Sequence, residues 1–332
     1  MNNYRLIPAD SAEWDLLLKD IPHSFAHTRD NCFAMSLTTG FKTFLFVFEK
    51  DNVRIVCPLS ERSFRGYTDI VTPYGFSGFT GNGVHPDFLS SWNEFTKQNN
   101  YICGYISLNP LFESPDYYKE SDTFTNTNLY FIDLRLSLTE LFENLDSNRK
   151  RIIRNFRKEE AGFTYDRNTL TEFFVNNYYD FLKRINASEA NYFKRETLEL
   201  ICSLENIFMA GAVENERIVA VYIFAHTEYS ADCLFNVAVP EGRKYTPTLF
   251  WAGLKYFRSR KIPALNLGGG LKEDDNVALS KERFGGYKLP FRNLKQIYRR
   301  EIYDSLCSDL NIDNEDLKGY FPAYRKKATA KN

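Results

Sequence analysis

Runs of apolar and β-branched residues predict most of the strands of this chain of 332 residues. Each run is short and is bounded by turn residues, as Asp51-Asn52 bounds two runs that form a hairpin. In the first half the predicted strands are 41–48, 53–58, 101–108 and 129–134. In the second half they are 207–213, 217–226, 231–239 and 264–267.

Apolar residues spaced three and four apart, together with capping residues, predict the helices. The predicted helices are 13–19, 86–98, 169–185, 195–204 and 246–260. Ser137-Leu138-Thr139-Glu140 has the form of a capping box and predicts a further helix start. Because hairpins lead into a strand–helix–strand unit in each half, the pattern predicts an α/β fold of the mixed α+β kind, in which mixed sheets are flanked by helices.

Two short matches indicate an internal duplication. Arg54-Ile55-Val56 parallels Arg217-Ile218-Val219, and Pro73-Tyr74-Gly75 parallels Pro240-Glu241-Gly242, at offsets of 163 and 167 residues. The order of hairpin, Pro-x-Gly loop, helix and strand also recurs, which favours duplication over a chance match. We therefore expect two domains, 1–135 and 136–332.

Composition and charge exclude several classes of protein. The hydrophobic content of 43% is that of a globular chain, and the net charge of −1 gives no overall attraction to DNA or to a membrane surface. The six cysteines lack CxxC spacing and indicate reduced thiols. No apolar run has the length of a membrane span, and the start lacks an apolar signal core, so we expect a soluble cytoplasmic protein without a transmembrane segment.

The stretch from Leu265 to Gly285 carries the most distinctive residues. Gly268, Gly269 and Gly270 follow a short apolar run, where the backbone must pass close to something bulky or make a tight turn. Lys281 follows eleven residues after Gly270. A lysine at that place could hold a phosphate or stabilise a developing oxyanion, and the alternative is a solvated surface lysine.

A cationic turn precedes this stretch. Gly242, Arg243, Lys244 and Tyr245 lead into Thr246-Pro247, which has the form of an N-cap followed by the first helical position. Free backbone N–H groups at such a helix start, with two cations beside them, predict a diphosphate site. The alternative is an exposed basic turn.

A basic helix is predicted at 148–158, where six of ten consecutive residues are Lys or Arg. Ile152, Ile153 and Phe156 form an apolar stripe on it. Arg151 and Arg154 would then belong to a cationic wall for a nucleotide diphosphate, coenzyme A or tRNA. A solvated helix whose stripe packs on the core is the alternative.

Other chemistries find little support in the sequence. The four histidines, two of which are His23 and His27, have no pattern of metal ligands around them, so we expect no metal. The sequence also lacks the G-x-S-x-G elbow, the P-loop and the G-x-G-x-x-G fingerprint. Hydrolase, kinase and dehydrogenase functions are therefore disfavoured.

Four elements in this order resemble the FemAB-like proteins and related acyltransferases of the GNAT superfamily. They are the Pro73-Tyr74-Gly75 loop, the basic helix 148–158, the turn 242–247, and Asn266-Leu267-Gly268-Gly269-Gly270 followed by Lys281-Glu282-Arg283-Phe284-Gly285. The resemblance covers nearly the whole chain. It implies two GNAT-like halves and the transfer of an acyl or aminoacyl group to an amine.

By the same resemblance, Lys281 matches the family lysine near the reacting centre and Gly268–Gly270 match the wall of the cleft. Two departures concern the acceptor: Ser280 stands where the family usually has an aromatic residue, and the early loop reads Tyr-Gly-Phe-Ser-Gly rather than Tyr-Gly-Gly-Pro. The acceptor amine is expected near Tyr74 and Lys281. It would belong to a nucleotide sugar or another cell-envelope precursor, for polysaccharide or peptidoglycan.

The leading hypothesis is an N-acyltransferase that uses acyl-CoA as co-substrate and has no tightly bound cofactor. The donor would lie along the strand 231–239 with its diphosphate on the turn 242–247. The alternative is a FemAB-type enzyme that takes its group from aminoacyl-tRNA, which the basic helix with Arg149, Arg151 and Arg154 would bind. A third hypothesis is a binding module without activity, to which Ser280 is the only hint.

Overall fold

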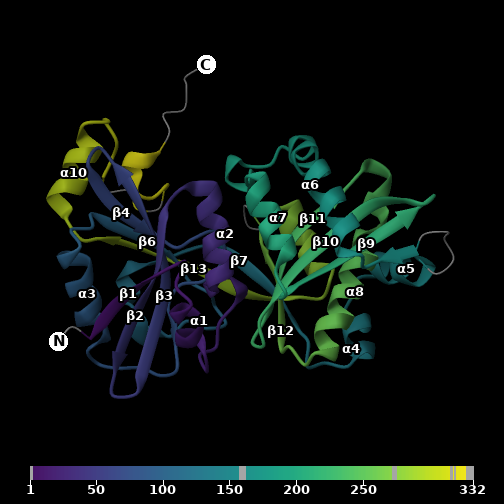
Figure 1. Cartoon of the computed structure of the whole chain (residues 1–332), viewed down its shortest axis with the longest axis horizontal. Coiled ribbons are helices and arrows are strands. Elements are labelled where there is room, and N and C mark those ends of the chain that lie inside the picture. The colour runs from purple at the N-terminus through teal and green to yellow at the C-terminus, as the bar shows by residue number, and fades with distance from the viewer. Residues whose placement is uncertain (1–2, 157–161, 271–274, 315–316, 318, 327–332) are drawn as a thin grey trace. The chain divides into compact units, whose positions relative to one another are not determined.

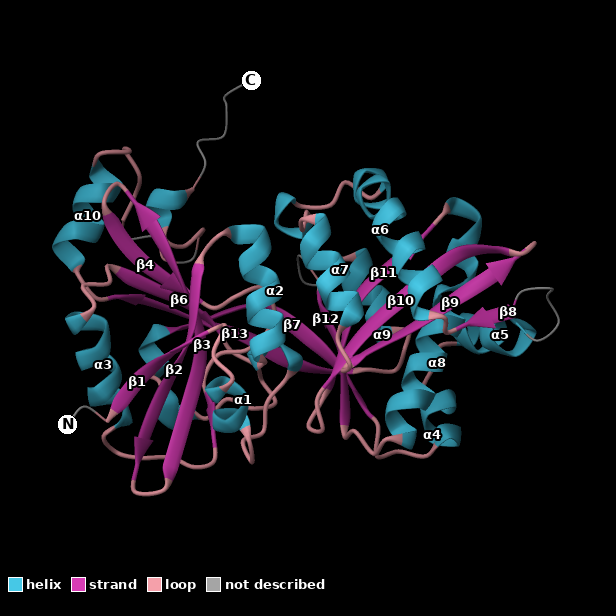
Figure 2. Cartoon of the chain, in the orientation of Figure 1, coloured by secondary structure: helices cyan, strands magenta, loops and turns pink. Residues whose placement is uncertain are grey.

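The computed structural model describes residues 3–156, 162–270, 275–314, 317 and 319–326. The chain divides into two compact units, an N-terminal unit of Met1–Asn126 with Pro290–Asn332 and a C-terminal unit of Thr127–Leu289. Both units combine helices with strands, as Figure 1 and Figure 2 show. The division differs from the expected domains 1–135 and 136–332, because the segment after residue 289 belongs with the N-terminal unit.

The N-terminal unit is built on a mixed sheet. Its strands are β1 (Tyr4–Pro8), β2 (Lys42–Lys50), β3 (Val53–Phe64), β4 (Tyr67–Val71), β5 (Thr80–Gly81), β6 (Cys103–Ser107) and most of β13 (Tyr287–Ile297). Its α-helices in the described residues are α1 (Glu13–Leu18), α2 (Arg29–Thr39), α3 (Phe88–Gln98) and α10 (Arg300–Ser308). The strand order is β1-β2-β3-β4-β6-β13, and only the β4–β6 pair is parallel.

Aromatic side chains fill the core between this sheet and α3. Phe46, Phe88, Trp92 and Phe95 are each almost completely buried, and the rings of Phe46 and Phe95 lie 4.7 Å apart. Offset and edge-to-face contacts between such rings add to the free energy of burial. The high aromatic content of the chain is therefore used in part to build this core.

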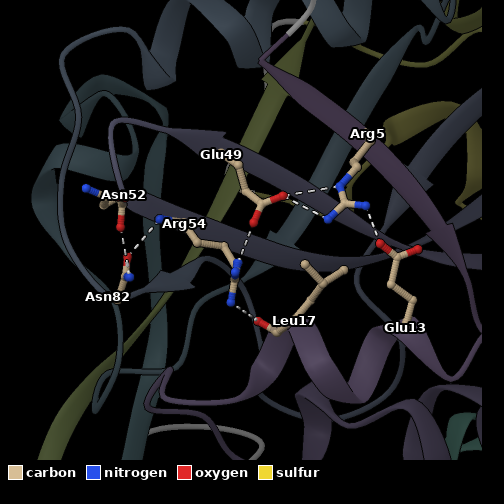
Figure 3. Close-up of polar contacts among 7 residues, drawn as sticks. All are labelled: Arg5, Glu13, Leu17, Glu49, Asn52, Arg54 and Asn82. Atoms are coloured by element: carbon tan, nitrogen blue, oxygen red, sulfur yellow. Dashed lines mark hydrogen bonds and ion pairs between the residues drawn. The ribbon is translucent and has the colours of Figure 1, made fainter.

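Charged side chains tie the hairpin of β2 and β3 to β1 and α1 (Figure 3). Glu49 accepts hydrogen bonds from Arg5 and Arg54, both at 2.8 Å. Arg5 also pairs with Glu13 of α1, and Arg54 donates to the carbonyl of Leu17 at 3.3 Å. The Arg54-Ile55-Val56 landmark of the repeat thus begins with a residue that braces this end of the unit.

The C-terminal unit contains a second mixed sheet. Its strands are most of β7 (Thr123–Asp133), β8 (Gly162–Thr164), β9 (Ile207–Glu214), β10 (Arg217–His226), β11 (Ala231–Ala238) and β12 (Ala264–Gly269). Its α-helices in the described residues are α4 (Leu138–Glu143), α5 (Ser147–Asn155), α6 (Arg167–Arg184), α7 (Arg195–Ser203), α8 (Thr246–Ser259) and α9 (Asn276–Glu282). The strand order is β8-β9-β10-β11-β12-β7, and only β11 and β12 are parallel.

Helices cover both faces of this second sheet. Ala210 and Ala212 of β9 pack in one buried cluster with Leu249 of α8. Gly211 lies between them and faces the other way, where a Cβ atom would come within 2.2 Å of Leu170 in α6. Since successive side chains of a strand point to opposite faces, α8 and α6 cover opposite faces of the sheet.

The two sheets repeat one topology, which confirms the predicted duplication. In the N-terminal unit β1, β2 and β3 are followed by the parallel pair β4 and β6, with α3 between them in the chain, and then by the antiparallel strand β13. In the C-terminal unit β8, β9 and β10 are followed by the parallel pair β11 and β12, with α8 between them in the chain, and then by the antiparallel strand β7. The last strands are exchanged along the chain. β7 follows β6 but pairs with β12, and β13 follows β12 but pairs with β6, where Asn293 lies opposite Ser107. This pairing places the segment after residue 289 in the N-terminal unit.

The mixed α+β class expected from the pattern is confirmed, and Ser137 and Glu140 form the predicted capping box at the start of α4. Eight α-helices and strands of the described residues were not predicted: α2, α9, α10, β1, β4, β5, β8 and β13. Among the described residues, none of the helices combines the length and the apolar character needed to cross a bilayer.

Candidate functional site

The two parallel strands of the C-terminal sheet separate soon after they begin. β11 and β12 are paired only at Ala231 with Leu265 and at Asp232 with Asn266. The amide of Asn266 donates to the carboxylate of Asp232 at 3.0 Å, and both side chains are buried. Beyond this pair the strands diverge and leave a split in the sheet. A crevice where neighbouring parallel strands part is a common binding site in α/β proteins.

A β-bulge lies in β11 just past the last paired position. Ile223 is opposite Phe235 and Phe224 is opposite Cys233, so Leu234 is an extra residue in the strand. A bulge takes the backbone of the extra residue out of the regular ladder and bends the strand. The side chains from Cys233 to Asn236 remain partly exposed. This part of β11 can therefore present backbone polar groups to a ligand in the split.

Gly268 and Gly269 form the end of β12 on the other side of the split, and Gly270 follows the strand. Gly268 has a φ of +76°, a conformation that glycine adopts without strain, and its N–H donates to the side chain of Asn266 at 2.8 Å. A Cβ atom on Gly269 would lie 2.9 Å from the carbonyl oxygen of Asn128. Both glycines are thus required by the backbone. Gly270 is partly exposed, and the acidic loop 271–274 lies outside the described residues.

Lys281 of α9 reaches back to this turn. Its Nζ donates to the carbonyl of Gly269, and a Cβ atom on Gly268 would lie only 3.1 Å from the same nitrogen. The side chain makes no ion pair with another described residue. Burial lowers the pKa of Lys281 to about 8, against a smaller opposing effect of Cys233 and Asp275. Lys281 is therefore a largely buried ammonium group rather than a solvated surface lysine.

The residues after Lys281 hold α9 against the start of α5. Phe284 is buried, and its ring lies 4.1 Å from that of Phe250 in α8. Gly285 has a φ of +78°, and a Cβ atom there would lie 2.6 Å from the carbonyl oxygen of Asn144. The N–H of Asp146 donates to the carbonyl of Arg283 at 3.0 Å. The Phe-Gly pair of the motif therefore fixes where α9 carries Lys281.

The turn before α8 differs from its prediction. Residues Pro240–Tyr245 already form a 3₁₀ helix, so the N-cap of α8 is Tyr245 and Thr246 does not cap with its side chain. The N–H of Gly242 donates to Val239 and that of Thr246 donates to Arg243, so these groups are not free for a phosphate. The prediction that Thr246 is the N-cap was wrong, because the chain enters the helix through a tighter turn that uses its own N–H groups.

The side chains of this turn have divided roles. A Cβ atom on Gly242 would lie 1.9 Å from the carbonyl oxygen of Val219 in β10, so the glycine lets the turn pack on the sheet. Lys244 forms an ion pair with Glu214 at 2.7 Å, and Tyr245 donates to the same carboxylate at 2.9 Å. Arg243 is exposed.

A pocket of about 260 Å³ brings the basic helix and this turn together. It is lined by Arg151, Ile152, Asn155, Phe156, Lys244, Tyr245 and Thr248. The hydroxyl of Thr248 is buried and has no hydrogen-bond partner among the described residues. Arg154 stacks on Phe142 instead, with its guanidinium 5.0 Å from the ring centre. Residues 157 and 158 of the predicted basic helix lie outside the described residues.

Tyr74 belongs to the N-terminal unit and is half exposed. Buried polar side chains hold its loop in place through hydrogen bonds. Ser24 donates to the carbonyl of Phe76 at 3.0 Å, and Asn109 donates to the same oxygen at 2.9 Å. His27 lies under this loop and is completely buried, and burial lowers its pKa to about 3. Tyr74 therefore lies on a loop that is hydrogen-bonded to the core, and His27 has a structural role.

Comparison with known proteins places the fold. No family model matches the sequence, and no curated protein matches it. Among solved structures, FemX superimposes with a TM-score of 0.68 at 11% identity, over 88% of this chain and 97% of the FemX chain. The chain has the fold of FemX.

Other solved structures show the same FemX-like fold. A conserved protein of unknown function from Bacteroides thetaiotaomicron has a TM-score of 0.61 at 12% identity, over 90% of this chain and 100% of that one. L-PGS from Bacillus licheniformis has a TM-score of 0.59 at 13% identity, over 90% of this chain and 95% of that one. The expected FemAB-like fold is confirmed.

The structure unites some predicted residues and adds others. Gly268, Gly269 and Lys281 meet at one turn, and Arg151 meets Lys244 at one pocket. Sequence reasoning missed the bulge at Leu234, the Tyr222–Cys233 pair on the α8 face, and the contact of Arg149 with Ser280.

Proposed function

We propose that this chain is an N-acyltransferase that moves an acyl group from acyl-CoA to an amine, with the reaction centred on Lys281 at the split between β11 and β12. The FemX fold supports the class of reaction. The observation that carries the proposal is a largely buried lysine beside that split, which makes no ion pair with another described residue.

In this reaction the neutral amine of the acceptor attacks the thioester carbonyl. A C–N bond forms, the carbonyl oxygen becomes an oxyanion, and the C–S bond then breaks to release the CoA thiolate. The proton lost by the amine leaves through water or through the substrate and ends on the thiolate. The backbone at the Leu234 bulge and the ammonium of Lys281 would donate hydrogen bonds to the oxyanion.

The environment of Lys281 suits this role for a physical reason. Burial destabilises the ammonium, as its lowered pKa shows, and the charge of Asp275 only partly offsets the cost. Negative charge that develops on the substrate would offset that cost only in the transition state. An interaction that strengthens in this way lowers the activation barrier rather than only tightening binding.

The diphosphate of the donor would lie in the pocket between α5 and the start of α8. Arg151 and Lys244 supply positive charge there, and the hydroxyl of Thr248 supplies a polar group that has no partner among the described residues. Arg243 is exposed nearby and would add charge at the rim. The acyl chain would then run along β11 toward the bulge.

A thermal-shift titration with acetyl-CoA, free CoA and a pool of charged tRNA tests the donor. A ligand that binds only the folded protein raises the melting temperature once its concentration exceeds Kd. We expect CoA and acetyl-CoA to raise it, and Arg151→Glu to weaken that rise. Lys183→Glu is the matched control, because Lys183 lies in α6 on the opposite face of the sheet. A chain that responds to neither CoA compound would contradict the proposal.

Aminoacyl-tRNA is the second candidate donor, and one feature favours it. α5 carries Arg151 and Arg154 on an exposed surface, where they could contact phosphates of a long polyanion. Binding of tRNA would fall steeply with salt and would be lost in the double variant Arg151→Glu/Arg154→Glu. The single variant Arg154→Glu should retain its CoA response, because Arg154 stacks on Phe142 and does not line the pocket.

The acceptor is proposed to be an amine of a nucleotide sugar or of another cell-envelope precursor. The proposal that Tyr74 takes part in binding it rests on the exposed position of this ring on a rigid loop. Tyr74→Phe and Tyr74→Ala, assayed with any acceptor that turns over, separate a role of the hydroxyl from a role of the ring. Equal KM values for both variants and the parent chain would remove Tyr74 from the site.

A further inference from the structure

Arg149 occupies an unusual position in the C-terminal unit. It lies in α5, and its Nη2 donates to the hydroxyl of Ser280 at 3.2 Å. The centre of its guanidinium group is 4.7 Å from the ring centre of Phe284. These two residues flank the segment that carries Lys281. The guanidinium is thus held beside the lysine by contacts across 131 positions of the sequence.

The guanidinium is not satisfied by these contacts. Its Nε is buried and has no hydrogen-bond partner, and the side chain makes no ion pair with another described residue. The charge of Asp146 acts on this guanidinium, but the Asp146 carboxylate accepts the backbone N–H of Arg149 at 2.7 Å as the N-cap of α5. Burial lowers the pKa of Arg149, and the charge of Asp146 only partly opposes this effect.

A half-buried cation with an unused donor is costly to keep. Buried polar groups are nearly always hydrogen-bonded, so the unpaired Nε of Arg149 is an exception, and one explanation for it is a partner that binds from outside the chain. For a guanidinium that partner is an oxyanion, which the planar array of N–H donors binds through two parallel hydrogen bonds.

Arg149 and Lys281 border the same pair of residues. Tyr222 and Cys233 are hydrogen-bonded to each other on the α8 face of the sheet. The charge of Arg149 acts on the phenol of Tyr222, and the charge of Lys281 acts on the thiol of Cys233. Both cations therefore act on one hydrogen-bonded pair of side chains, and Ser280, which accepts the hydrogen bond of Arg149, directly precedes Lys281 in α9.

We propose that Arg149 binds a carboxylate of the acceptor, so that the acceptor is an amino acid or an amino-sugar acid whose amine lies at Lys281. This proposal rests on the proposed function for the identity of the amine as acceptor. A carboxylate fits better than a phosphate. Lys281 is needed for the oxyanion, so the bound group meets only the single positive charge of Arg149. Phosphate dianions would leave a second negative charge without a partner in this buried place.

The Nε–H of Arg149 offers a direct measurement on the whole chain. We would record its ¹H–¹⁵N resonance, assigned by its absence in Arg149→Lys, during titration with sodium acetate. We expect a saturable shift with acetate, no such shift with sodium chloride at equal ionic strength, and a smaller effect of glycinamide than of glycine. Arg260→Lys is the matched control, because Arg260 also stacks on an aromatic ring. The centre of its guanidinium group lies 4.6 Å from the ring centre of Tyr256.

A second variant keeps the test independent of the folding of Arg149→Lys. Ser280→Ala removes the acceptor that orients the guanidinium, and we expect it to weaken acetate binding roughly fivefold, the usual effect of one lost hydrogen bond. No shift with acetate, or equal shifts with glycine and glycinamide, would overturn the proposal. A larger shift with inorganic phosphate than with acetate would overturn the choice of a carboxylate. Because no donor is present, the result does not depend on whether acyl-CoA is the donor.

Discussion

The two units have the same split in their sheets but use it differently. In the N-terminal unit β4 and β6 pair in parallel only at Ile70 with Gly104 and at Val71 with Tyr105. In the C-terminal unit β11 and β12 also pair at two positions only. The connection that follows differs: residues 72–87 lead to α3, whereas the shorter stretch 239–245 leads to α8.

The long connection closes the split of the N-terminal unit. Ser77 forms a parallel bridge with Leu108, which extends β6 past its end. Gly78 has a φ of +74°, and a Cβ atom there would lie 2.9 Å from the Cα of Leu108. In the C-terminal unit the short turn packs on β10 through Gly242 instead. One topology therefore yields a braced sheet in one unit and an open split in the other, and the length of a single loop decides between them.

The largest effect is expected at Lys281. Lys281→Ala should lower kcat about a hundredfold, the usual loss for one donor to an oxyanion. Since the ammonium form is the active one, activity should fall as the pH rises through the lysine pKa of about 8. Lys281→Arg keeps its charge over this pH range, so its activity should not fall as the pH rises through 8. Steady-state kinetics across pH measure both effects.

Lys295 is the matching control in the N-terminal unit. It is also buried, but it donates to the carbonyls of Leu317 and Gly319 at 2.5 and 2.9 Å. Lys295→Ala should therefore reduce stability and leave kcat of the remaining folded protein nearly unchanged. A loss of turnover as large as that of Lys281→Ala would show that the two units do not divide their roles in this way.

Gly242→Ala tests the short turn that keeps the C-terminal split open. A Cβ atom 1.9 Å from the carbonyl oxygen of Val219 forces the turn away from β10, and overpacking of this kind costs about 1–3 kcal/mol. Urea unfolding measures the loss. Gly162→Ala is the control, because a Cβ atom there meets no other atom within 4 Å. Equal midpoints for the two variants would contradict the close packing of the turn.

Asn109→Ala tests the closed split of the N-terminal unit. Its side chain donates to Phe76 and accepts from the N–H of Leu111 at 3.0 Å, and it is buried. Removing it should cost about 1–2 kcal/mol and speed hydrogen exchange in residues 72–78. Asn99→Ala removes a similar hydrogen bond to Phe95 from an exposed position and should have less effect. Unchanged exchange in the loop would show that other contacts close the split.

The smallest effect is expected at Glu49 in the N-terminal unit. Burial raises the pKa of this carboxyl, but hydrogen bonds from Arg54 and Arg5 outweigh burial and hold the pKa below its ordinary value of 4.5. The stabilisation is therefore present above pH 4.5 and is lost as the pH falls through the lowered pKa. Glu49→Gln should cost about 1 kcal/mol or less at pH 7, since the side chain is partly exposed. Melting temperatures from pH 3 to 7 should converge for the two proteins at the acid end.

The sequence by itself determined the elements whose signals are local. The strand 217–226 and the helix start at 246 match β10 and α8, because apolar runs, hairpin turns and Pro247 act within a few residues. The duplication could also be recognised from the sequence, since both copies keep a hairpin and a Pro-x-Gly loop in the same order. The glycines of β12 marked a tight turn and a close approach of backbone, which the φ of Gly268 and the contact that a Cβ atom on Gly269 would make with Asn128 confirm.

Only the tertiary structure decided where these elements meet. The return of β13 to β6 joins residues far apart in the chain, and no local pattern encodes that partner. The burial that lowers the pKa of Lys281 comes from α9 packing against the turn of β12, and Arg149 reaches Ser280 across 131 positions. Local periodicity states which face of an element is apolar, but the free energy of a buried charge depends on every neighbour that the fold brings to it.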